Sequence, residues 1–207
     1  MNDMELFSYI ITGVIAYLLG SINTAIIISA LSGKDIRKEG SGNAGATNTL
    51  RVMGKKAAAL VALFDALKGV FAVIIARVVS SIAGIDANIP VCISALLVVL
   101  GHIYPVYFGF KGGKGIMTSI AVVFMLDWRM GLILFVICIA IMLITKYVSL
   151  GSCIGAVMFP VLTAIFHTEN TVLIIVSVII ALLAVVKHRT NIARLIKGTE
   201  SKLNFKK

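Results

Sequence analysis

Seven long apolar runs, separated by short polar segments, constrain this chain more than any other feature of its sequence. They cover roughly residues 6–32, 57–84, 89–109, 116–126, 130–144, 148–166 and 172–186, and each is bounded by charged residues, Gly or Asn. At a mean hydropathy of +1.05, the 207 residues hold too many apolar side chains for a water-soluble domain with one core. The sequence therefore predicts an all-α integral membrane protein with one helix for each run.

The number of membrane crossings depends on two short runs. Runs 116–126 and 130–144 fall below the ~17 residues that a perpendicular span needs. We expect seven transmembrane helices, two of them short. The alternative is five spans with residues 116–144 turned back as a re-entrant hairpin. In either case we expect a single membrane-embedded domain over residues 1–207.

Charge predicts the orientation in the membrane, because Lys and Arg in short loops mark the cytoplasmic side whereas acidic residues count for little. Most of the 19 basic residues lie in alternate segments, namely 33–56, 110–115, 145–147 and the tail from Lys187. The intervening ends carry Asp3, Glu5, Asp86, Asp127 with Arg129, and Glu169. The pattern predicts an N-terminus outside and a C-terminus in the cytoplasm.

Composition also argues against several other features. The first residues, MNDMELFSYI, are acidic where a signal peptide is basic. The net charge of +10 comes without a basic stripe interleaved with aromatics, so we exclude nucleic-acid binding. Cys92, Cys138 and Cys153 lie singly in apolar runs, as small core residues do. We predict no metal site and no cofactor.

The first polar cluster runs from Lys38 to Lys56, KEGSGNAGATNTLRVMGKK. Its glycines would let backbone N–H groups converge on an anion, although a solvated Gly-rich linker is the simpler alternative. A helix that begins near Thr47 would place Thr47, Asn48 and Arg51 on neighbouring faces. The N-terminal amides of that helix and the guanidinium fork of Arg51 favour phosphate as the ligand.

Two further clusters fall on the same predicted side of the membrane. The second, FKGGKG over residues 110–115, is a possible phosphate nest, and it lacks the spacing of a Walker motif that would imply ATP. Membrane anchoring would explain Lys111 and Lys114 equally well. The third, KHRTNIARLIKGTES from Lys187, places His188, Asn191 and Arg194 on one side of a helix. The predicted orientation places all three clusters on the cytoplasmic face, and a single site built from the three clusters would require this.

Two polar features lie within apolar runs. Asp65 and Lys68 are three residues apart and can pair on one helix, either to brace it or to line a functional site. His102, with Tyr104 and Pro105, is predicted to shape and kink its helix toward the cytoplasmic clusters.

The chain resembles the bacterial membrane acyl-phosphate:glycerol-3-phosphate acyltransferases in three segments, GSGNAGATNTLRVMGKKAAALVALFDALKG, GHIYPVYFGFKGGKGIMT and HRTNIARLIKGTE. The similarity extends over nearly the whole chain. It departs from the family in the stretch Gly20–Asn23, where Asn23 replaces a usual proline. This replacement concerns the bend of the first helix and not the chemistry.

The resemblance implies an activity, its partners and a location. A fatty acyl group would move from acyl phosphate to the 1-hydroxyl of sn-glycerol 3-phosphate, giving lysophosphatidic acid and phosphate, the first acylation of phospholipid synthesis. The implied partners are the two substrates and the lipid bilayer, without a cofactor, and the site would face the cytoplasm in a bacterial inner membrane. The implied catalytic residues are Ser41, Arg51, Lys114, His188 and Asn191. The implied substrate-binding residues are Gly42, Asn43, Gly45, Thr47, Asn48, Lys111, Gly112, Gly113, Arg194 and Glu200.

The route of acyl transfer and two other functions stay open. Acyl phosphate is already activated, so we expect direct transfer, with Ser41 orienting a substrate and His188 or a substrate phosphate oxygen taking the proton. A transporter for a phosphorylated solute is the alternative, although the chain shows no internal repeat. A purely structural membrane subunit would leave the Gly-rich loops unexplained.

Overall fold

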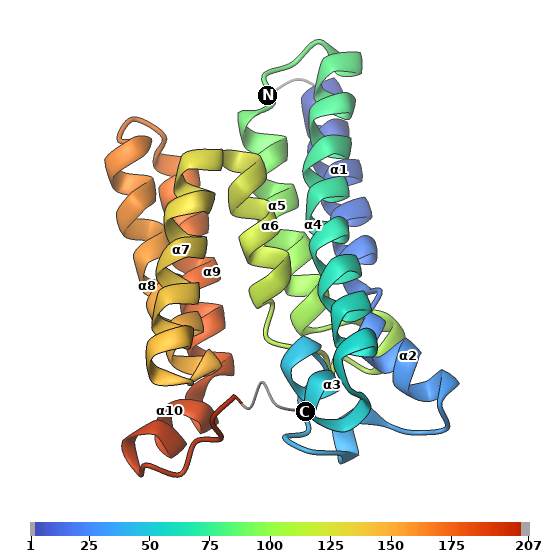
Figure 1. Ribbon diagram of the computed structural model, residues 1–207. Coiled ribbons are helices and arrows are strands. Elements are labelled where there is room, and N and C mark those ends of the chain that lie inside the picture. The colour runs from blue at the N-terminus through green and yellow to red at the C-terminus, as the bar shows by residue number, and fades with distance from the viewer. Residues whose placement is uncertain (1–2, 204–207) are drawn as a thin grey trace. The chain divides into compact units, whose positions relative to one another are not determined.

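The computed structural model describes residues 3–203, and within that range every regular element is a helix (Figure 1). The chain divides into two compact units, one up to Val122 and one from Val123 onward. The apolar runs are helical, which confirms the all-α prediction, but the first run forms two helices and not the one expected.

The first unit is built on three long helices, α1 (Asp3–Ser21), α4 (Lys55–Ala83) and α5 (Asn88–Ile103), which pack side by side (Figure 1). Short helices lie near one end of these, namely α2 (Thr24–Leu31), η1 (Ile36–Lys38), α3 (Ala46–Met53) and η2 (Val106–Phe108). Helix α6 (Ile116–Leu126) follows and crosses the border between the units.

Glycines allow α1 and α5 to pack closely. A Cβ at Gly20 would collide with the backbone carbonyl of Val98, and one at Gly101 would collide with the carbonyl of Tyr17. Close backbone approach through small residues is a common way for helices to associate in lipid, where no hydrophobic drive holds them together. Ser94 adds a polar tie, because its Oγ donates to the carbonyl of Ala72 in α4 over 2.8 Å.

The first apolar run is broken between α1 and α2. The buried Asn23 stands at the break, where its Oδ1 accepts a hydrogen bond of 3.1 Å from the amide of Ile26 and so caps α2. Its Nδ2 lies 3.4 Å from the carbonyl of Ala44 in the Gly-rich loop. The bend therefore forms without a proline, because Asn satisfies the helix start and also reaches the neighbouring loop.

The two ends of the first unit differ in net charge, although Asp35 and Glu39 also lie at the basic end. Asp3, Glu5 and Asp86 lie at the end that holds the start of α1 and the α4–α5 turn. The opposite end holds α2, α3 and the loop after α5 (Figure 1), with Lys34, Arg37, Lys38, Arg51, Lys55, Lys56, Lys111 and Lys114. The fold keeps the separation of charge on which the predicted orientation rests, and the orientation itself stays a prediction.

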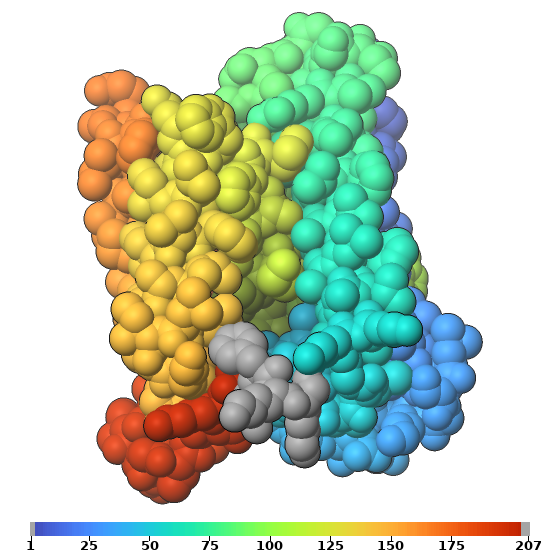
Figure 2. Space-filling view, viewed as in Figure 1, coloured from blue at the N-terminus to red at the C-terminus, as the bar shows by residue number. Residues whose placement is uncertain are grey.

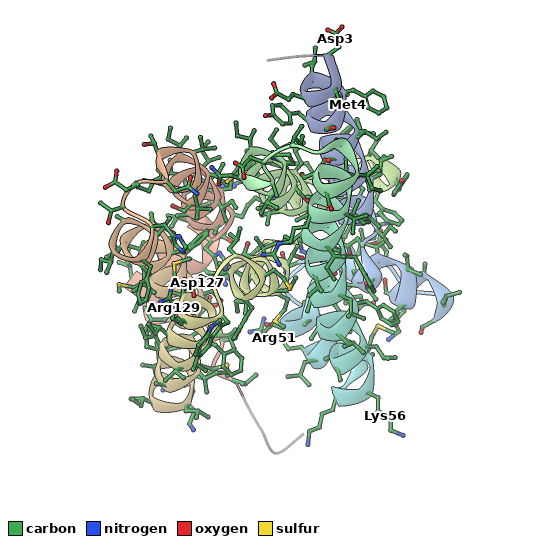
Figure 3. All side chains as sticks on the ribbon, turned by 90° about the horizontal axis from the view of Figure 1, so that it is seen from above. Asp3, Met4, Arg51, Lys56, Asp127 and Arg129 are labelled. Carbon is green, nitrogen blue, oxygen red and sulfur yellow. The ribbon has the colours of Figure 1, made fainter. Side chains whose placement is uncertain are left out.

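The second unit contains α7 (Trp128–Thr145), α8 (Val148–Phe166), α9 (Thr171–Lys187) and α10 (Arg189–Ile196). Helix α8 packs against both α7 and α9. Asp127 caps α7 and pairs with Arg129 over 2.7 Å, and Figure 3 shows the two side chains at the start of that helix. His167, from the turn after α8, lies 3.1 Å from the same carboxylate, which ties the two turns at this end of the unit.

Five helical segments are long and apolar enough to cross a membrane, namely Asp3–Leu31, Lys55–Ala83, Asn88–Phe108, Trp128–Thr145 and Val148–Phe166. The pair α9 and α10, bent by 58°, would make a sixth. Because α7 has 18 residues, it is longer than its apolar run suggested and meets the length of a span. Helix α6 has 11 residues and stays short, so the number of crossings remains a prediction.

Bulky apolar side chains face outward along the long helices. Phe64 and Phe71 of α4 are each 51% exposed, and Figure 2 shows α4 at the surface of the first unit along most of its length. An apolar exterior around helices with polar loops at their ends is expected when lipid replaces water as the solvent.

Candidate active site

The Gly-rich loop of the first cluster is organised around the buried side chain of Asn48. Its Oδ1 accepts from the amide of Ser41 over 2.8 Å, and its Nδ2 donates to the carbonyls of Ile36 and Glu39 over 3.1 and 2.9 Å. One amide thus holds three points of the loop. The family resemblance implies that Asn48 binds substrate. Its contacts favour a role in shaping the loop, and direct binding stays a prediction.

Two glycines permit the path of this loop. Gly40 and Gly42 have φ of 57° and 72°, in the left-handed region that side chains disfavour. A Cβ at Gly40 would also collide with Oδ1 of Asn48. The loop can close over Asn48 only with glycine at these positions.

The loop leads into α3, which begins at Ala46 and so confirms the helix predicted to start near Thr47. Gly45 precedes it and offers no side chain to cap the first amides. Arg51 is exposed on α3, and no hydrogen bond or ion pair within residues 3–203 engages it. Ser41 is exposed and Thr47 is half-buried. The start of α3 and the loop before it offer backbone amides and the Ser41 hydroxyl, and Arg51 adds a guanidinium from the last turn of the same short helix. These are groups of the kind that bind phosphate.

The second cluster folds back onto the end of α5. The amides of Gly112 and Gly113 donate to the carbonyls of Ile103 and His102 over 3.2 and 3.1 Å. A Cβ at Gly113 would collide with Nε2 of His102 and would also meet the carbonyl oxygen of Ala44. Gly113 therefore lies directly between α5 and the first loop. The two Gly-rich clusters meet, as a composite site requires. Lys111 is exposed and Lys114 is half-buried.

A buried polar network lies beneath these loops. Nζ of Lys68 is 3.0 Å from Oδ1 of Asp65, which confirms the predicted pair within α4. The same Nζ lies 2.8 Å from Nδ1 of His102 and donates to the carbonyls of Gly20 and Ile22 over 3.1 and 3.0 Å. The sequence indicated the pair and a shaping role for His102, but it gave no signal that the three side chains meet.

The third cluster, in the second unit, is organised around Glu200. Its carboxylate accepts from Asn191 and Ser149 over 2.7 and 2.8 Å, and it pairs with Arg194 over 2.6 Å. Burial by itself would raise the pKa of Glu200, but these hydrogen bonds and the charge of Arg194 outweigh it and hold the pKa below its ordinary value.

These contacts bear on the roles of Glu200 and Ser149. Glu200 was assigned to substrate binding, yet a carboxylate repels phosphate, so its contacts favour a role in holding Asn191 and Arg194. Ser149 was missed, because a serine in an apolar helix carries no signal in the sequence.

His188 is buried at the bend between α9 and α10, with Nδ1 2.8 Å from the carbonyl of Ala184. Because a carbonyl can only accept, this contact assigns the ring proton to Nδ1 and leaves Nε2 as the basic nitrogen. That tautomer suits a general base. The role of His188 as the base stays a prediction.

Among the described residues, no group of His, Cys, Asp and Glu side chains is arranged to hold a metal ion. The first two clusters lie in the first unit and His188, Asn191 and Arg194 lie in the second. A composite site of all three clusters therefore stays a prediction, as does every assigned site residue.

The fold and these clusters define a helical integral membrane protein with Gly-rich loops and basic side chains at the ends of its helices. A family model described as glycerol-3-phosphate acyltransferase matches residues 10–198. A glycerol-3-phosphate acyltransferase of Thermoanaerobacter pseudethanolicus is 49% identical over 198 residues, 95% of this chain and 96% of that protein. One of Clostridioides difficile is 42% identical over 99% of this chain and 100% of that protein.

Solved structures agree with these sequence matches. An integral membrane glycerol 3-phosphate acyltransferase in its glycerol 3-phosphate form superimposes with a TM-score of 0.86 at 38% identity, over 95% of this chain and 96% of that one. Its lysophosphatidic acid form gives a TM-score of 0.82 over the same shares. The chain belongs to the glycerol-3-phosphate acyltransferase family.

Proposed function

We propose that this protein transfers a fatty acyl group from acyl phosphate to the 1-hydroxyl of sn-glycerol 3-phosphate, giving lysophosphatidic acid and inorganic phosphate. Membership of the glycerol-3-phosphate acyltransferase family, with 49% identity to one relative of that name, carries the acceptor and the reaction type. A solved relative described in a glycerol 3-phosphate form and a lysophosphatidic acid form supports the same substrate and product. The reaction would be the first acylation of phospholipid synthesis.

The choice of acyl phosphate as donor is supported by the loops. Both substrates of the proposed reaction bear a phosphate, and the chain carries two Gly-rich loops that meet at Gly113, with Arg51 and Lys114 nearby in the sequence. If the acyl donor bears a phosphate as the acceptor does, each of the two loops could bind one phosphate. The lipid tail of the donor would lie among the apolar helices, and the charged acceptor would come from water.

We propose direct transfer. The 1-hydroxyl oxygen attacks the carbonyl carbon of acyl phosphate, the bond from that carbon to the phosphate oxygen breaks, and phosphate leaves. The hydroxyl proton passes to Nε2 of His188 or to a substrate phosphate oxygen. Arg51 and Lys114 stabilise the negative charge that develops on the carbonyl oxygen and the leaving phosphate, and Ser41 orients a substrate.

The distribution of charge supports a site on the cytoplasmic side of a bacterial inner membrane. Sixteen of the 19 basic residues lie in the segments predicted to be cytoplasmic, which include all three clusters. Glycerol 3-phosphate would then enter from the cytosol and acyl phosphate from the bilayer.

The test is acyl transfer by the purified protein in detergent or nanodiscs. Acyl phosphate with glycerol 3-phosphate should give lysophosphatidic acid and one equivalent of phosphate, whereas acyl-CoA, the control donor, should give none. Product from acyl-CoA alone would overturn the donor assignment. No product from either donor, with uptake of glycerol 3-phosphate into proteoliposomes, would favour a transporter.

A further inference from the structure

The buried trio of Asp65, Lys68 and His102 is used by none of the proposed chemical steps, yet it connects the broken first helix to the second Gly-rich loop. Relative exposures of 1%, 6% and 3% place the three residues inside the first unit. Ionisable groups buried inside a membrane protein are costly, so their presence marks them as candidates for a function.

The hydrogen bonds of Lys68 assign the tautomer of His102. An ammonium group has three N–H donors and no acceptor. The carbonyls of Gly20 and Ile22 take two of them, and Nδ1 of His102, 2.8 Å away, takes the third. Nδ1 is therefore an acceptor, and the ring proton of a neutral His102 lies on Nε2.

Asp65 contributes charge to this trio. Its Oδ1 lies 3.0 Å from Nζ of Lys68, but among the described residues no hydrogen bond in good geometry reaches that oxygen. The carboxylate thus neutralises the ammonium and leaves its three donors for the two carbonyls and the ring. The backbone carbonyl of Asp65 accepts from Thr118 of α6 over 2.9 Å, which joins a further helix to the network.

The far side of the His102 ring meets the loop. A Cβ at Gly113 would collide with Nε2 and would also meet the carbonyl of Ala44, so the ring edge, the Gly113 backbone and the first loop are in close contact. The Gly113 amide also donates to the His102 carbonyl. His102 thus fixes the distance between α5 and the point where the two loops meet.

We propose that His102, oriented by Lys68, is a positioning residue that holds the Gly112–Gly113 segment against the first Gly-rich loop in the geometry needed for phosphate. This inference rests on the proposed function for its kinetic consequence only. The structural part, restraint of residues 104–115 by the Nε2 side of the ring, holds for any ligand of these loops.

A pair of substitutions separates the two sides of the ring. In His102→Asn the amide can occupy the position of Nδ1 and keep the contact with Lys68, but it cannot reach Gly113. In His102→Gln the amide can extend to the position of Nε2 and keep the contact with the loop. The control is Ser94→Ala, which removes an equally buried polar tie of α5 away from the loops.

Hydrogen exchange of the protein in detergent, read by mass spectrometry, tests the restraint directly. His102→Asn should exchange faster over residues 104–115 and as the parent does over α1 and α4, whereas His102→Gln should stay close to the parent over all three. Parent-like exchange of 104–115 in His102→Asn would overturn the proposal. Equal acceleration of every peptide in both variants would also overturn it, because it would show a general structural role.

Kinetics provide the second readout. His102→Asn should lower kcat/KM for one of the phosphate substrates by on the order of 100-fold, as a small misplacement of a binding group does, and His102→Gln by less than about tenfold. Ser94→Ala should match the parent. Equal losses in the Asn and Gln variants would refute the positioning role. An inactive parent would instead refute the proposed function, and the exchange result would stand independently of it.

Discussion

Arg51 lies exposed on α3, at the end of the first unit where the Gly-rich loops meet. We predict that Arg51→Lys is not a conservative change, because Lys supplies the charge without the planar fork that binds two phosphate oxygens. The loss should be about 1.5–3 kcal/mol in transition-state binding, seen as a roughly 10- to 150-fold fall in kcat/KM for glycerol 3-phosphate.

The control for Arg51 is Lys56→Ala. Lys56 is also exposed, and it lies at the start of the neighbouring helix α4 (Figure 3). The Lys56→Ala substitution removes a whole positive charge from the same end of the unit but should leave kcat/KM for glycerol 3-phosphate unchanged. If Arg51→Lys behaves as Lys56→Ala does, Arg51 is not part of the site.

Ser41 is exposed in the first loop, where a hydroxyl could orient a substrate or attack one. We predict that it forms no acyl-enzyme, because a positioned alcohol can attack the mixed anhydride directly. Intact-protein mass spectrometry after incubation with acyl phosphate alone should show no adduct. A stoichiometric acyl adduct that glycerol 3-phosphate removes, and that Ser41→Ala lacks, would establish the covalent route.

Glu200 links stability to pH. Because its pKa is lowered in the folded protein, the folded state favours the carboxylate, so this stabilisation is present above the ordinary pKa of 4.5 and is lost as the pH falls through the lower folded value. Thermal unfolding in detergent should show this loss below about pH 4.5 in the parent.

Glu200→Gln should flatten this part of the pH profile and lower the Tm at pH 7, because an amide N–H would face Arg194. The exposed Glu169 offers the matched control, and Glu169→Gln should keep the parent profile. An unchanged profile in Glu200→Gln would show that the carboxylate does not stabilise the fold.

At the scale of elements, the close contact of α1 with α5 depends on glycine. Gly101→Ala would force a Cβ into the carbonyl of Tyr17, and overpacking of this kind costs about 1–3 kcal/mol. The Tm should fall clearly. Val14→Ala, on the outward face of α1, is the control and should change the Tm little, because Val14 is 50% exposed. Equal Tm values for the two variants would mean that the helices can move apart without cost.

The Asp65–Lys68 pair places two opposite charges in the buried interior of the first unit. Lys68→Met alone would leave a buried carboxylate without its partner, at a cost of about 3–5 kcal/mol. Asp65→Leu combined with Lys68→Met should recover much of the lost stability, because no charge remains buried. Both variants are compared by thermal unfolding. A double variant as unstable as Lys68→Met would show that packing, and not charge, dominates there.

At the scale of the whole molecule, the separation of acidic and basic ends makes the orientation testable. Asp86→Cys, in the α4–α5 turn, should react with an impermeant thiol reagent in intact cells, whereas Lys34→Cys should react only after permeabilisation. The native cysteines lie within helices, with Cys92 buried. Labelling of Lys34→Cys from outside would reverse the topology and place the loops on the other face.

Much of this architecture follows from the sequence alone. The apolar runs predicted every long helix, because in lipid a backbone can satisfy its hydrogen bonds only within a helix or a closed barrel. The start of α3 near Thr47 and the pairing of Asp65 with Lys68 also follow from local spacing. The helices, the start of α3 and the Asp65–Lys68 pair could be predicted because each depends on residues that are close together in the sequence.

Only the tertiary structure decided what the polar residues contact. Asn48 turns inward to hold the Gly-rich loop, Glu200 binds Ser149 across 51 positions, and Lys68 bonds to His102 and to carbonyls at the break after α1. A hydrophobic pattern specifies which segments enter the membrane, because burial depends on composition. It carries no information on which buried donor meets which acceptor, because that depends on how helices from distant parts of the chain pack.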